Sequence, residues 1–331
     1  MGVCPEIIWN DGEMGIGNKN SEMRGLGEDH KRHAPFGIIR FRIAYAVLLV
    51  IYCLFVLLDT FVLPRNIVRI ERALKDLGAH GDYDAVITED SYDDGKIRIS
   101  INTERIDRTT VYIADVEIAD PSLLKAGLAG DSFGRNLVEN TSRIAARNEA
   151  VFAINGDYYG FREKGYVLRN GYLYRSRSNT KYPYGEDLVI MKDGSFEIVN
   201  EADHTARELV KEGAEQVFSF GPALVIDGTV QVREGEEVER AQITNPRTAI
   251  GLVEPLHYMM VVSDGRTRES RGLSLYRLAE LMQELGCETA YNLDGGGSST
   301  IWFNGKVLNK PTTYGDVFEE RPISDIVYIG Y

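Results

Sequence analysis

The densest group of polar side chains in the sequence covers 291–300 and reads YNLDGGGSST. Three consecutive glycines let a backbone approach a ligand closely, and successive N–H groups can form an anion-binding nest. Asp294, at the end of the strand-like segment ETAYNL, can place a carboxylate beside that nest. A plain strand connection is the alternative, but a turn rarely needs three glycines together with three hydroxyls. No lysine follows the glycines, so the segment is not a P-loop.

Three further polar groups stand where apolar, strand-like runs begin or end. They are 155–160 (NGDYYG), 244–248 (TNPRT) and 263–266 (SDGR). Side chains at strand ends can converge on a ligand while the sheet holds them rigid. Arg247 and Arg266 suit a phosphate or carboxylate, because a planar guanidinium can donate two parallel hydrogen bonds. Each group alone could equally be a turn or a solvated charge, so the prediction depends on their combination.

The composition excludes several kinds of protein and site. The 37 Lys and Arg residues against 50 Asp and Glu give a net charge of −13, which argues against a general nucleic-acid binder. The five histidines form no HExxH or paired metal spacing, and neither a GxSxG elbow nor a strand-linked GxGxxG loop is present. Cys4, Cys53 and Cys287 are too few for a disulfide framework. Cys287 is expected to be a buried packing residue.

The segments that must position these polar groups are mostly strands. Strand-like runs flank four Asn-Gly or Asp-Gly pairs, at 170–171, 193–194, 227–228 and 304–305. Such pairs tolerate the positive φ of a type I′ turn, so each predicts a hairpin. Helical spacing marks 137–148 and 274–285, the second with Ser274 as N-cap and Gly286 at its end. The sequence therefore predicts an α+β fold, with a mixed or antiparallel sheet and few helices in one domain over 96–331.

One apolar run divides the chain. Residues 43–63 carry a single charge, Asp59, and at about 1.5 Å rise per residue they can cross a bilayer core of about 30 Å. We predict a transmembrane helix, since a buried soluble helix would show a polar stripe and a cleaved signal peptide would have a shorter apolar region. Before it, 1–42 is predicted to be a polar cytoplasmic tail. After it, 64–95 is predicted to be a stalk or linker that begins as a helix up to Gly78.

The side of the membrane on which the domain lies is less tightly specified. Basic residues gather just before the apolar run, and the positive-inside bias slightly favours a cytoplasmic N-terminus. The domain would then be extracytoplasmic. Its single thiol, Cys287, is compatible with either side of the membrane.

In order along the chain, the motifs NGDYYG, NPRTAIGL and SDGR, an amphipathic helix and NLDGGGSST resemble the phosphodiester glycosidase family. The resemblance covers 111–331 and includes FSFGPALVIDG at 218–228, which is similar to the family's central Gly-Pro-x-Leu-x-x-Asp-Gly element. It implies an extracytoplasmic hydrolase that cleaves the bond between a sugar's anomeric carbon and a phosphodiester oxygen. The first motif departs from the family's common Gly-Phe-Phe or Asp-Phe-Phe pattern, because Tyr158 and Tyr159 add hydroxyl groups there.

The resemblance also implies roles for residues in these motifs. Asp294 and Asp264 would be the carboxylates that flank the scissile bond, as acid and as base or nucleophile in an order that the sequence leaves open. Arg247, with Arg266, would hold the phosphate. The other substrate contacts would come from Asn155, Asp157, Asn245, Gly295, Gly296, Gly297, Ser298 and Ser299. Because phosphate is already a good leaving group, Asp157 could instead clamp the sugar. A divalent metal held by Asp157, Asp264 and Asp294 is possible, although their spacing does not demand one.

Two functions of different classes follow. The first is a membrane-anchored hydrolase that cleaves a sugar-1-phosphodiester in a cell-envelope or exopolysaccharide glycan. The second is a non-catalytic glycan-binding or polysaccharide-assembly protein that uses the same pocket without turnover. The acids in the motifs favour the enzyme, since a pure binder of an anionic ligand gains nothing from carboxylates beside it. In both cases the partners are a sugar-phosphate glycan and, through 43–63, the membrane.

Overall fold

The computed structural model describes residues 36–63, 65–69, 85–179, 185–238, 243–315 and 317–331. Most of the predicted tail and the 70–84 part of the predicted stalk lie outside the described residues. The chain divides into two compact units, Met1–Phe55 and Val56–Tyr331. The second unit contains all of the described sheet structure.

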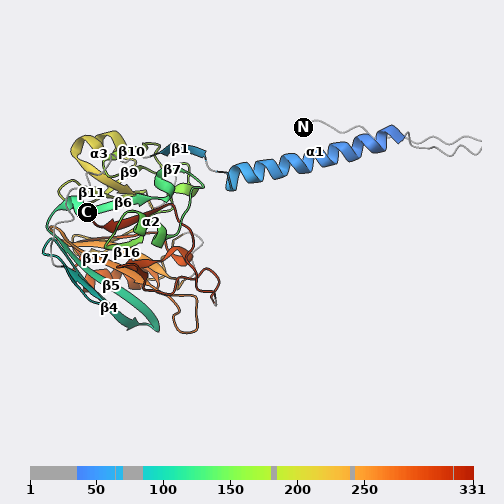
Figure 1. Ribbon diagram of the computed structural model, residues 1–331. Helices are drawn as coiled ribbons and strands as arrows, with labels where there is room; N and C mark the ends of the chain where they lie inside the picture. The colour runs from blue at the N-terminus through green and yellow to red at the C-terminus, as the bar shows by residue number, and fades with distance from the viewer. Residues whose placement is uncertain (1–35, 64, 70–84, 180–184, 239–242, 316) are drawn as a thin grey trace, which may run out of the picture. The chain divides into compact units, whose positions relative to one another are not determined.

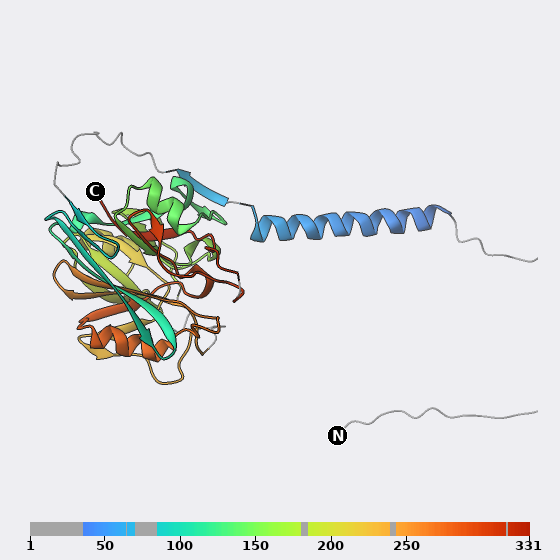
Figure 2. The same ribbon diagram turned by 60° about the horizontal axis from the view of Figure 1, so that its bottom comes forward.

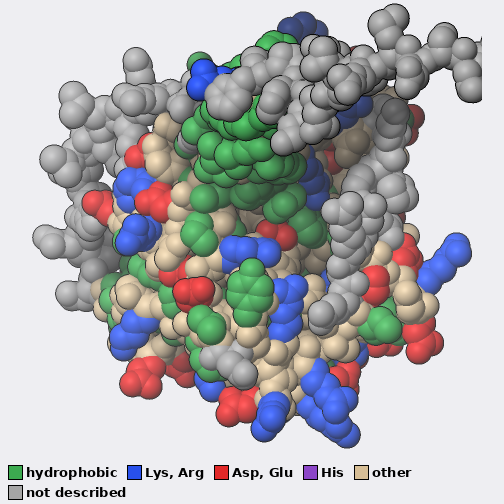
Figure 3. Space-filling model, turned by 90° about the vertical axis from the view of Figure 1, so that its right-hand side faces the viewer, with side chains coloured by type: hydrophobic (Ala, Val, Ile, Leu, Met, Phe, Trp, Pro, Cys, Tyr) green, Lys and Arg blue, Asp and Glu red, His purple; other side chains and the backbone are tan. Residues whose placement is uncertain are grey.

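Helix α1 (Phe36–Phe61) contains the predicted apolar run. Within the described part of the chain, Ile39–Phe61 is the one helical stretch long and apolar enough to cross a bilayer. Figure 3 shows the helix end-on as a column of mostly hydrophobic side chains, and these side chains are exposed along nearly its whole length. Such a surface needs an apolar environment. Its length and composition fit a membrane anchor and also a signal sequence.

The chain is extended where a helical stalk was expected to begin. Strand β1 (Arg65–Arg69) pairs antiparallel with β7 (Ser132–Arg135), so the helical prediction is wrong at 65–69. Ile67 and Val68 are β-branched and favour an extended chain, and β7 supplies a pairing partner that local spacing cannot reveal. The rest of the predicted helix lies outside the described residues.

One large sheet, two five-stranded sheets and the two-stranded sheet of β1 and β7 form the second unit (Figures 1 and 2). The nine strands of the large sheet are, in spatial order, β15 (Thr229–Val230), β14 (Ala223–Ile226), β18 (Thr289–Asn292), β16 (Arg247–Glu254), β17 (His257–Ser263), β5 (Thr109–Ile118), β4 (Ile97–Ile106), β3 (Ser91–Asp93) and β2 (Val86–Ile87). One five-stranded sheet has the order β10 (Tyr172–Arg175), β9 (Val167–Arg169), β13 (Ala214–Phe218), β11 (Glu186–Met191) and β12 (Phe196–Asn200). The other has the order β20 (Lys306–Val307), β19 (Ile301–Phe303), β8 (Phe152–Asn155), β21 (Asp325–Ile329) and β6 (Leu124–Leu128).

Every described strand pair is antiparallel, which confirms the predicted α+β fold with few helices. Strands β2 and β3 belong to the large sheet, so this sheet begins at Val86, upstream of the Lys96 start expected for the domain.

The large sheet and the two five-stranded sheets share one apolar core. The helices are α2 (Thr141–Arg147), α3 (Ala206–Glu212) and α4 (Leu275–Glu284). On β17, Tyr258 and Met260 face the core between the large sheet and the two smaller ones, whereas Met259 faces α4 on the opposite side. Helices α2 and α3 cover the outer faces of the smaller sheets. The layers are therefore α4, the large sheet, the smaller sheets, and α2 with α3.

All four predicted hairpins are present, as β9–β10, β11–β12, β14–β15 and β19–β20. Both residues of the pairs at 170–171, 227–228 and 304–305 have positive φ, as a type I′ turn requires. At 193–194 only Gly194 does.

The predicted helices are also present, with adjusted bounds. Helix α4 begins directly after Ser274, whose hydroxyl accepts the Arg277 N–H. Helix α2 is shorter than the predicted 137–148. Hydrophobic spacing does not reveal α3, although Thr205 and Glu208 form a capping box at its start.

Candidate active site

Three of the polar groups lie at one edge of the large sheet. Strands β18, β16 and β17 are neighbours and alternate in direction. Arg247 opens β16, whereas Asp294 and Asp264 follow the ends of β18 and β17. Antiparallel pairing brings the start of β16 and the ends of its two neighbours to the same edge. The structure thus brings these groups together as the sequence predicts.

The glycine loop after β18 carries the chain from the large sheet to a smaller one, through the single turn η4 (Gly296–Ser298). A side chain would not fit at Gly295 and would be strained at Gly296. A Cβ on Gly295 would lie 2.8 Å from the Pro246 carbonyl oxygen. A Cβ on Gly296, where φ is 64°, would lie 2.7 Å from a guanidinium nitrogen of Arg266. The glycines therefore let the loop pack directly on the two arginine-bearing groups.

The N–H groups of this loop are mostly bonded within the protein. Gly296 donates to the Pro246 carbonyl (2.8 Å), Ser298 to Gly295 (3.3 Å), and Ser299 to Gly296 (3.2 Å). The Ser299 hydroxyl is buried without a hydrogen-bond partner, and Gly297 packs against Thr313. Backbone bonds thus close much of the expected anion nest, so side chains are left as the main donors for an anion.

Asn155 ties a smaller sheet to the glycine loop. This residue ends β8 and is fully buried. Its amide donates to the Asp294 backbone carbonyl (2.6 Å), and its side-chain oxygen accepts from the Thr248 hydroxyl (2.8 Å) and the Thr300 N–H (3.1 Å). Asn155 therefore cross-links three of the polar groups from behind the site.

The converging loops enclose a main cavity of about 440 Å³. Its charged lining consists of four guanidinium groups and one carboxylate: Arg162, Arg247, Arg266, Arg321 and Asp294. The remaining lining comes from Tyr158, Phe220, Val238, Asn245, Asn292, Leu293, Gly295 and Gly296. Figure 3 shows basic side chains gathered around a hollow on the face turned to the viewer. A cavity of this size and charge suits a small anionic ligand.

Neighbouring groups hold two of these guanidinium planes. Arg247, 2% exposed, donates from Nε to the Leu273 carbonyl (3.1 Å) and pairs through Nη2 with Glu237. Burial lowers the pKa of Arg247, and the charge of Glu237 opposes that shift. Arg266 donates from Nε to the side-chain oxygen of Asn245 (2.9 Å), and burial also lowers its pKa. Asn245 thus both lines the cavity and orients Arg266.

Asp294 lines the main cavity and also a small cavity of about 150 Å³ beside it. Its Oδ2 accepts from the Ser298 hydroxyl (2.6 Å) and lies 3.6 Å from Nη2 of Arg321. Burial raises the pKa of Asp294, while Arg321 and the Ser298 hydroxyl oppose the rise. Such a carboxylate is suited to proton transfer or to nucleophilic attack.

Asp157 is the carboxylate that the structure brings beside Asp294. It lines the small cavity with Asp294, and its charge contributes to the raised pKa of Asp294. Asp264 lines neither cavity. One of its oxygens accepts the Lys310 N–H at 2.9 Å, and burial raises its pKa. Among the described residues, no three His, Cys, Asp or Glu side chains gather in a way that could hold a metal ion.

Two lining arginines lie outside the motifs that the sequence singles out. Arg321 donates to the Ser298 hydroxyl (2.7 Å) and to the Gly295 carbonyl (3.1 Å), both from Nη2. Arg162 lies over the ring of Tyr158, 5.7 Å from its centroid. Both arginines stand in charged stretches, EERPIS and FREKG, that are typical of solvent-exposed surface. Only the fold shows that they reach the cavity.

Comparisons with known proteins agree with this architecture. Residues 148–330 match the phosphodiester glycosidase family. The chain is 29% identical over 218 residues to the N-acetylglucosamine-1-phosphodiester alpha-N-acetylglucosaminidase of Mus musculus, covering 60% of this chain and 41% of that protein. It is 30% identical over 203 residues to the SPbeta prophage-derived uncharacterized protein YomE of Bacillus subtilis (strain 168), covering 60% of this chain and 31% of that protein. The chain thus spans less than half the length of these curated relatives.

A solved structure supports the fold. The catalytic domain of zebrafish N-acetylglucosamine-1-phosphodiester alpha-N-acetylglucosaminidase, auto-inhibited by its pro-peptide, superposes with a TM-score of 0.55 at 21% identity, over 71% of this chain and 83% of that chain. A protein from Synechocystis shares the fold at a TM-score of 0.50 and 15% identity, over 71% of this chain and 62% of that one. Since the family match takes in more than half of its residues, the chain belongs to the phosphodiester glycosidase family.

Proposed function

We propose that the protein hydrolyses the bond between the anomeric carbon of a sugar and a phosphodiester oxygen, releasing the free sugar and a phosphomonoester. One observation carries this proposal: four guanidinium groups and the buried carboxylate of Asp294 line a single cavity. Guanidinium groups suit a phosphate, and a carboxylate suits the positive charge that develops at the anomeric carbon. The relatives named for N-acetylglucosamine-1-phosphodiesters make N-acetylglucosamine the first sugar to test.

The arginines and the carboxylates would divide the work between the two cavities. Arg247 and Arg266, both fixed by neighbours, would hold the phosphate in the main cavity. The sugar would occupy the small cavity, which Asp157 and Asp294 line. The bond from the anomeric carbon to oxygen then breaks with its electron pair on the phosphate oxygen, the water oxygen bonds to that carbon, and a carboxylate takes the proton of the water. The guanidinium groups would stabilise the negative charge that collects on the phosphate.

Asp264 has a different part in this proposal. Its carboxylate accepts the Lys310 N–H, and its own N–H donates to the Thr110 carbonyl. It would fix the loop that carries Arg266 and thereby position that arginine. Asp294 would then act at the scissile bond, and Asp157 would clamp the sugar in the small cavity beside it.

The cellular setting forms a further part of the proposal. Helix α1 would anchor the protein in the membrane, with the domain outside the cytoplasm, and the substrate would be a cell-envelope or exopolysaccharide glycan. A tag placed after Tyr331, tested for protease access on intact cells, would check the sidedness. Protection of the tag until the cells are lysed would contradict it.

The activity is tested by incubating the full chain, purified in detergent, with the methyl phosphodiester of N-acetylglucosamine 1-phosphate. We expect release of free sugar and methyl phosphate by the wild type and its loss in Asp294→Asn. The matched control is Asp227→Asn, a change of the same kind at an exposed hairpin turn, which should leave the rate unchanged. Folded protein that binds N-acetylglucosamine 1-phosphate tightly without any turnover of phosphodiesters would favour the glycan-binding alternative.

A further inference from the structure

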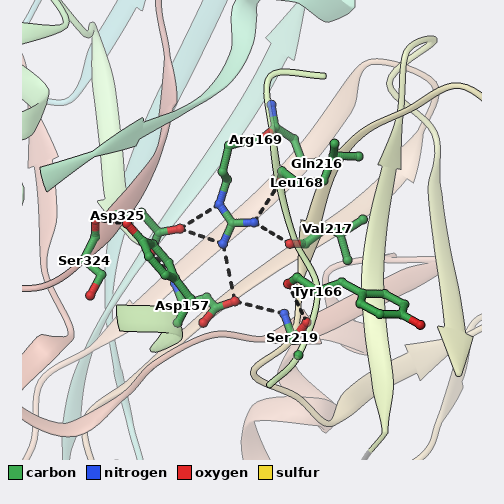
Figure 4. A network of polar contacts seen from close by, with 12 residues as sticks. Asp157, Tyr166, Leu168, Arg169, Gln216, Val217, Ser219, Ser324 and Asp325 are labelled. Atoms are coloured by element: carbon green, nitrogen blue, oxygen red, sulfur yellow. Dashed lines mark hydrogen bonds and ion pairs between the residues drawn. The ribbon is translucent and has the colours of Figure 1, made fainter. Parts of the chain in front are cut away.

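Behind the small cavity lies a buried ionic network centred on Arg169 at the end of β9 (Figure 4). The side chain of Arg169 is 1% exposed. Its Nε donates to Oδ2 of Asp325 (2.7 Å), its Nη2 to Oδ2 of Asp157 (3.3 Å), and its Nη1 to the carbonyls of Leu168 (2.9 Å) and Val217. A guanidinium that contacts two carboxylates and two carbonyls is held in one orientation.

The two oxygens of Asp157 have different surroundings. Oδ2 accepts from Arg169 and from the Ser219 N–H (3.0 Å). Oδ1 is buried and has no hydrogen-bond partner, and the residue lines the small cavity beside Asp294. A buried carboxyl oxygen without a hydrogen-bond partner is costly, so this oxygen is prepared for a donor that arrives with a ligand.

Asp325 supports this arrangement from the other side. It opens β21, and its Oδ1 accepts the backbone N–H of Asp157 at 2.9 Å, while its Oδ2 accepts from Arg169. A Cβ at position 156 would lie 2.5 Å from the same Oδ1, which is why Gly156 precedes Asp157. One carboxylate therefore fixes both the backbone of Asp157 and the guanidinium that holds its side chain.

We propose that Arg169 and Asp325 are positioning residues, which clamp one oxygen of Asp157 so that its other oxygen accepts a hydrogen bond from a sugar hydroxyl in the small cavity. This inference rests on the proposed function, because it needs a sugar as the ligand. The sugar ring would lie in the small cavity. The Arg169 network would then affect sugar binding through Asp157, without touching the sugar itself.

The test is a double-mutant cycle read as binding, with N-acetylglucosamine 1-phosphate as the probe and titration calorimetry of the full chain in detergent. We expect Arg169→Lys to weaken binding about tenfold, the effect of one hydrogen bond to a charged group, since a lysine cannot hold both carboxylates and both carbonyls. In a chain that already carries Asp157→Asn, Arg169→Lys should weaken binding less than about twofold, because Arg169 acts on the ligand only through the Asp157 carboxylate, which is no longer there. A purely structural role for Arg169 would give equal losses in both backgrounds and would overturn the inference.

Two further variants keep the test decisive. Arg147→Lys is the matched control, since Arg147 also contacts two carboxylates, Asp131 and Glu139, but lines neither cavity. The Arg147→Lys variant should bind the probe with the same affinity as the wild type. Should Arg169→Lys not fold, Asp325→Asn preserves the shape and the oxygen that accepts the Asp157 N–H, and it should weaken binding severalfold in the same direction. Unchanged affinity in Asp325→Asn would overturn the inference. Hydrolysis by the wild type would still support the proposed function in that case, whereas absence of both binding and hydrolysis would refute the two together.

Discussion

Arg321 offers the sharpest test of the site, because it contacts the proposed catalytic carboxylate and lines both cavities. Its Nη2 lies 3.6 Å from Oδ2 of Asp294 and 2.7 Å from the Ser298 hydroxyl, which itself donates to Asp294. Arg321→Gln would remove the positive charge while leaving a polar side chain of similar length. We expect it to weaken phosphate binding and to raise the pKa of Asp294 further, since Arg321 is the main group that opposes the rise caused by burial.

The size of the effect follows from the ion pair and the hydrogen bonds that the substitution removes. A hydrogen bond or close ion pair with a charged group contributes about 1.5–3 kcal/mol, and about 1.4 kcal/mol corresponds to a factor of ten in rate. We therefore expect kcat/KM for the methyl phosphodiester of N-acetylglucosamine 1-phosphate to fall about 10- to 100-fold in Arg321→Gln. The control Arg98→Gln removes an arginine from an exposed ion pair with Glu117 and should change kcat/KM by less than twofold.

The pH profile of kcat/KM gives a second readout, which also assigns the role of Asp294. If the ionised carboxylate reacts, the acidic limb of the profile moves to higher pH in Arg321→Gln. If the protonated carboxyl reacts, the basic limb moves to higher pH instead. A profile with both limbs unmoved, together with an unchanged kcat/KM, would refute the coupling between Arg321 and Asp294.

Three further predictions concern stability and reactivity. Asn155→Ala should lower the free energy of unfolding by about 3 kcal/mol in urea titrations, because three hydrogen-bond partners lose the buried Asn155 side chain. A loss under about 1 kcal/mol would contradict the role of Asn155 as a cross-link. Burial raises the pKa of Cys287 to about 12. In a chain carrying Cys4→Ser and Cys53→Ser, the Cys287 thiol should therefore react with a thiol reagent at pH 8 only as fast as the domain opens. Immediate labelling would argue against that burial. Burial also raises the pKa of Asp325, from 3.8 to about 7, so between these values the folded protein binds the extra proton and the free energy of unfolding falls as the pH rises. Asp325→Asn should flatten that part of the measured curve, and an unchanged slope would show that Asp325 titrates normally.

Much of the fold is predictable because its signals are local. Asn-Gly and Asp-Gly pairs mark hairpins through the φ values of only two residues, and Ser274 marks the start of α4 through a single hydrogen bond. The strand β1 is not predictable in this way. Its sequence fits a helix by spacing, and the strand exists because β7 lies beside it.

The site, too, is only partly predictable from the sequence. The gathering of Arg247, Asp264 and Asp294 follows from strand ends that meet at one edge of an antiparallel sheet. Which of the carboxylates faces the cavity depends on the conformation of each loop. Asp264 turns to the Lys310 N–H, whereas Asp157, from another sheet, reaches the small cavity. The spacing of motifs along the sequence carries no information about that choice.

Arg169 is the clearest case of a residue whose place the sequence does not predict, and its burial indicates what the ionic network of Arg169, Asp157 and Asp325 is for. In the run YVLRN an arginine at a strand end is typical of a solvent-exposed residue, yet the structure buries it beneath Asp157 and Asp325 because its sheet is covered on both faces. Buried ion pairs contribute little net stability, since removing charges from water costs about as much as their attraction returns. A fold that needed only stability at this position would do as well with apolar side chains. The arginine is therefore better explained by what it orients, which is an aspartate that lines the small cavity, with one oxygen held and the other buried without a hydrogen-bond partner.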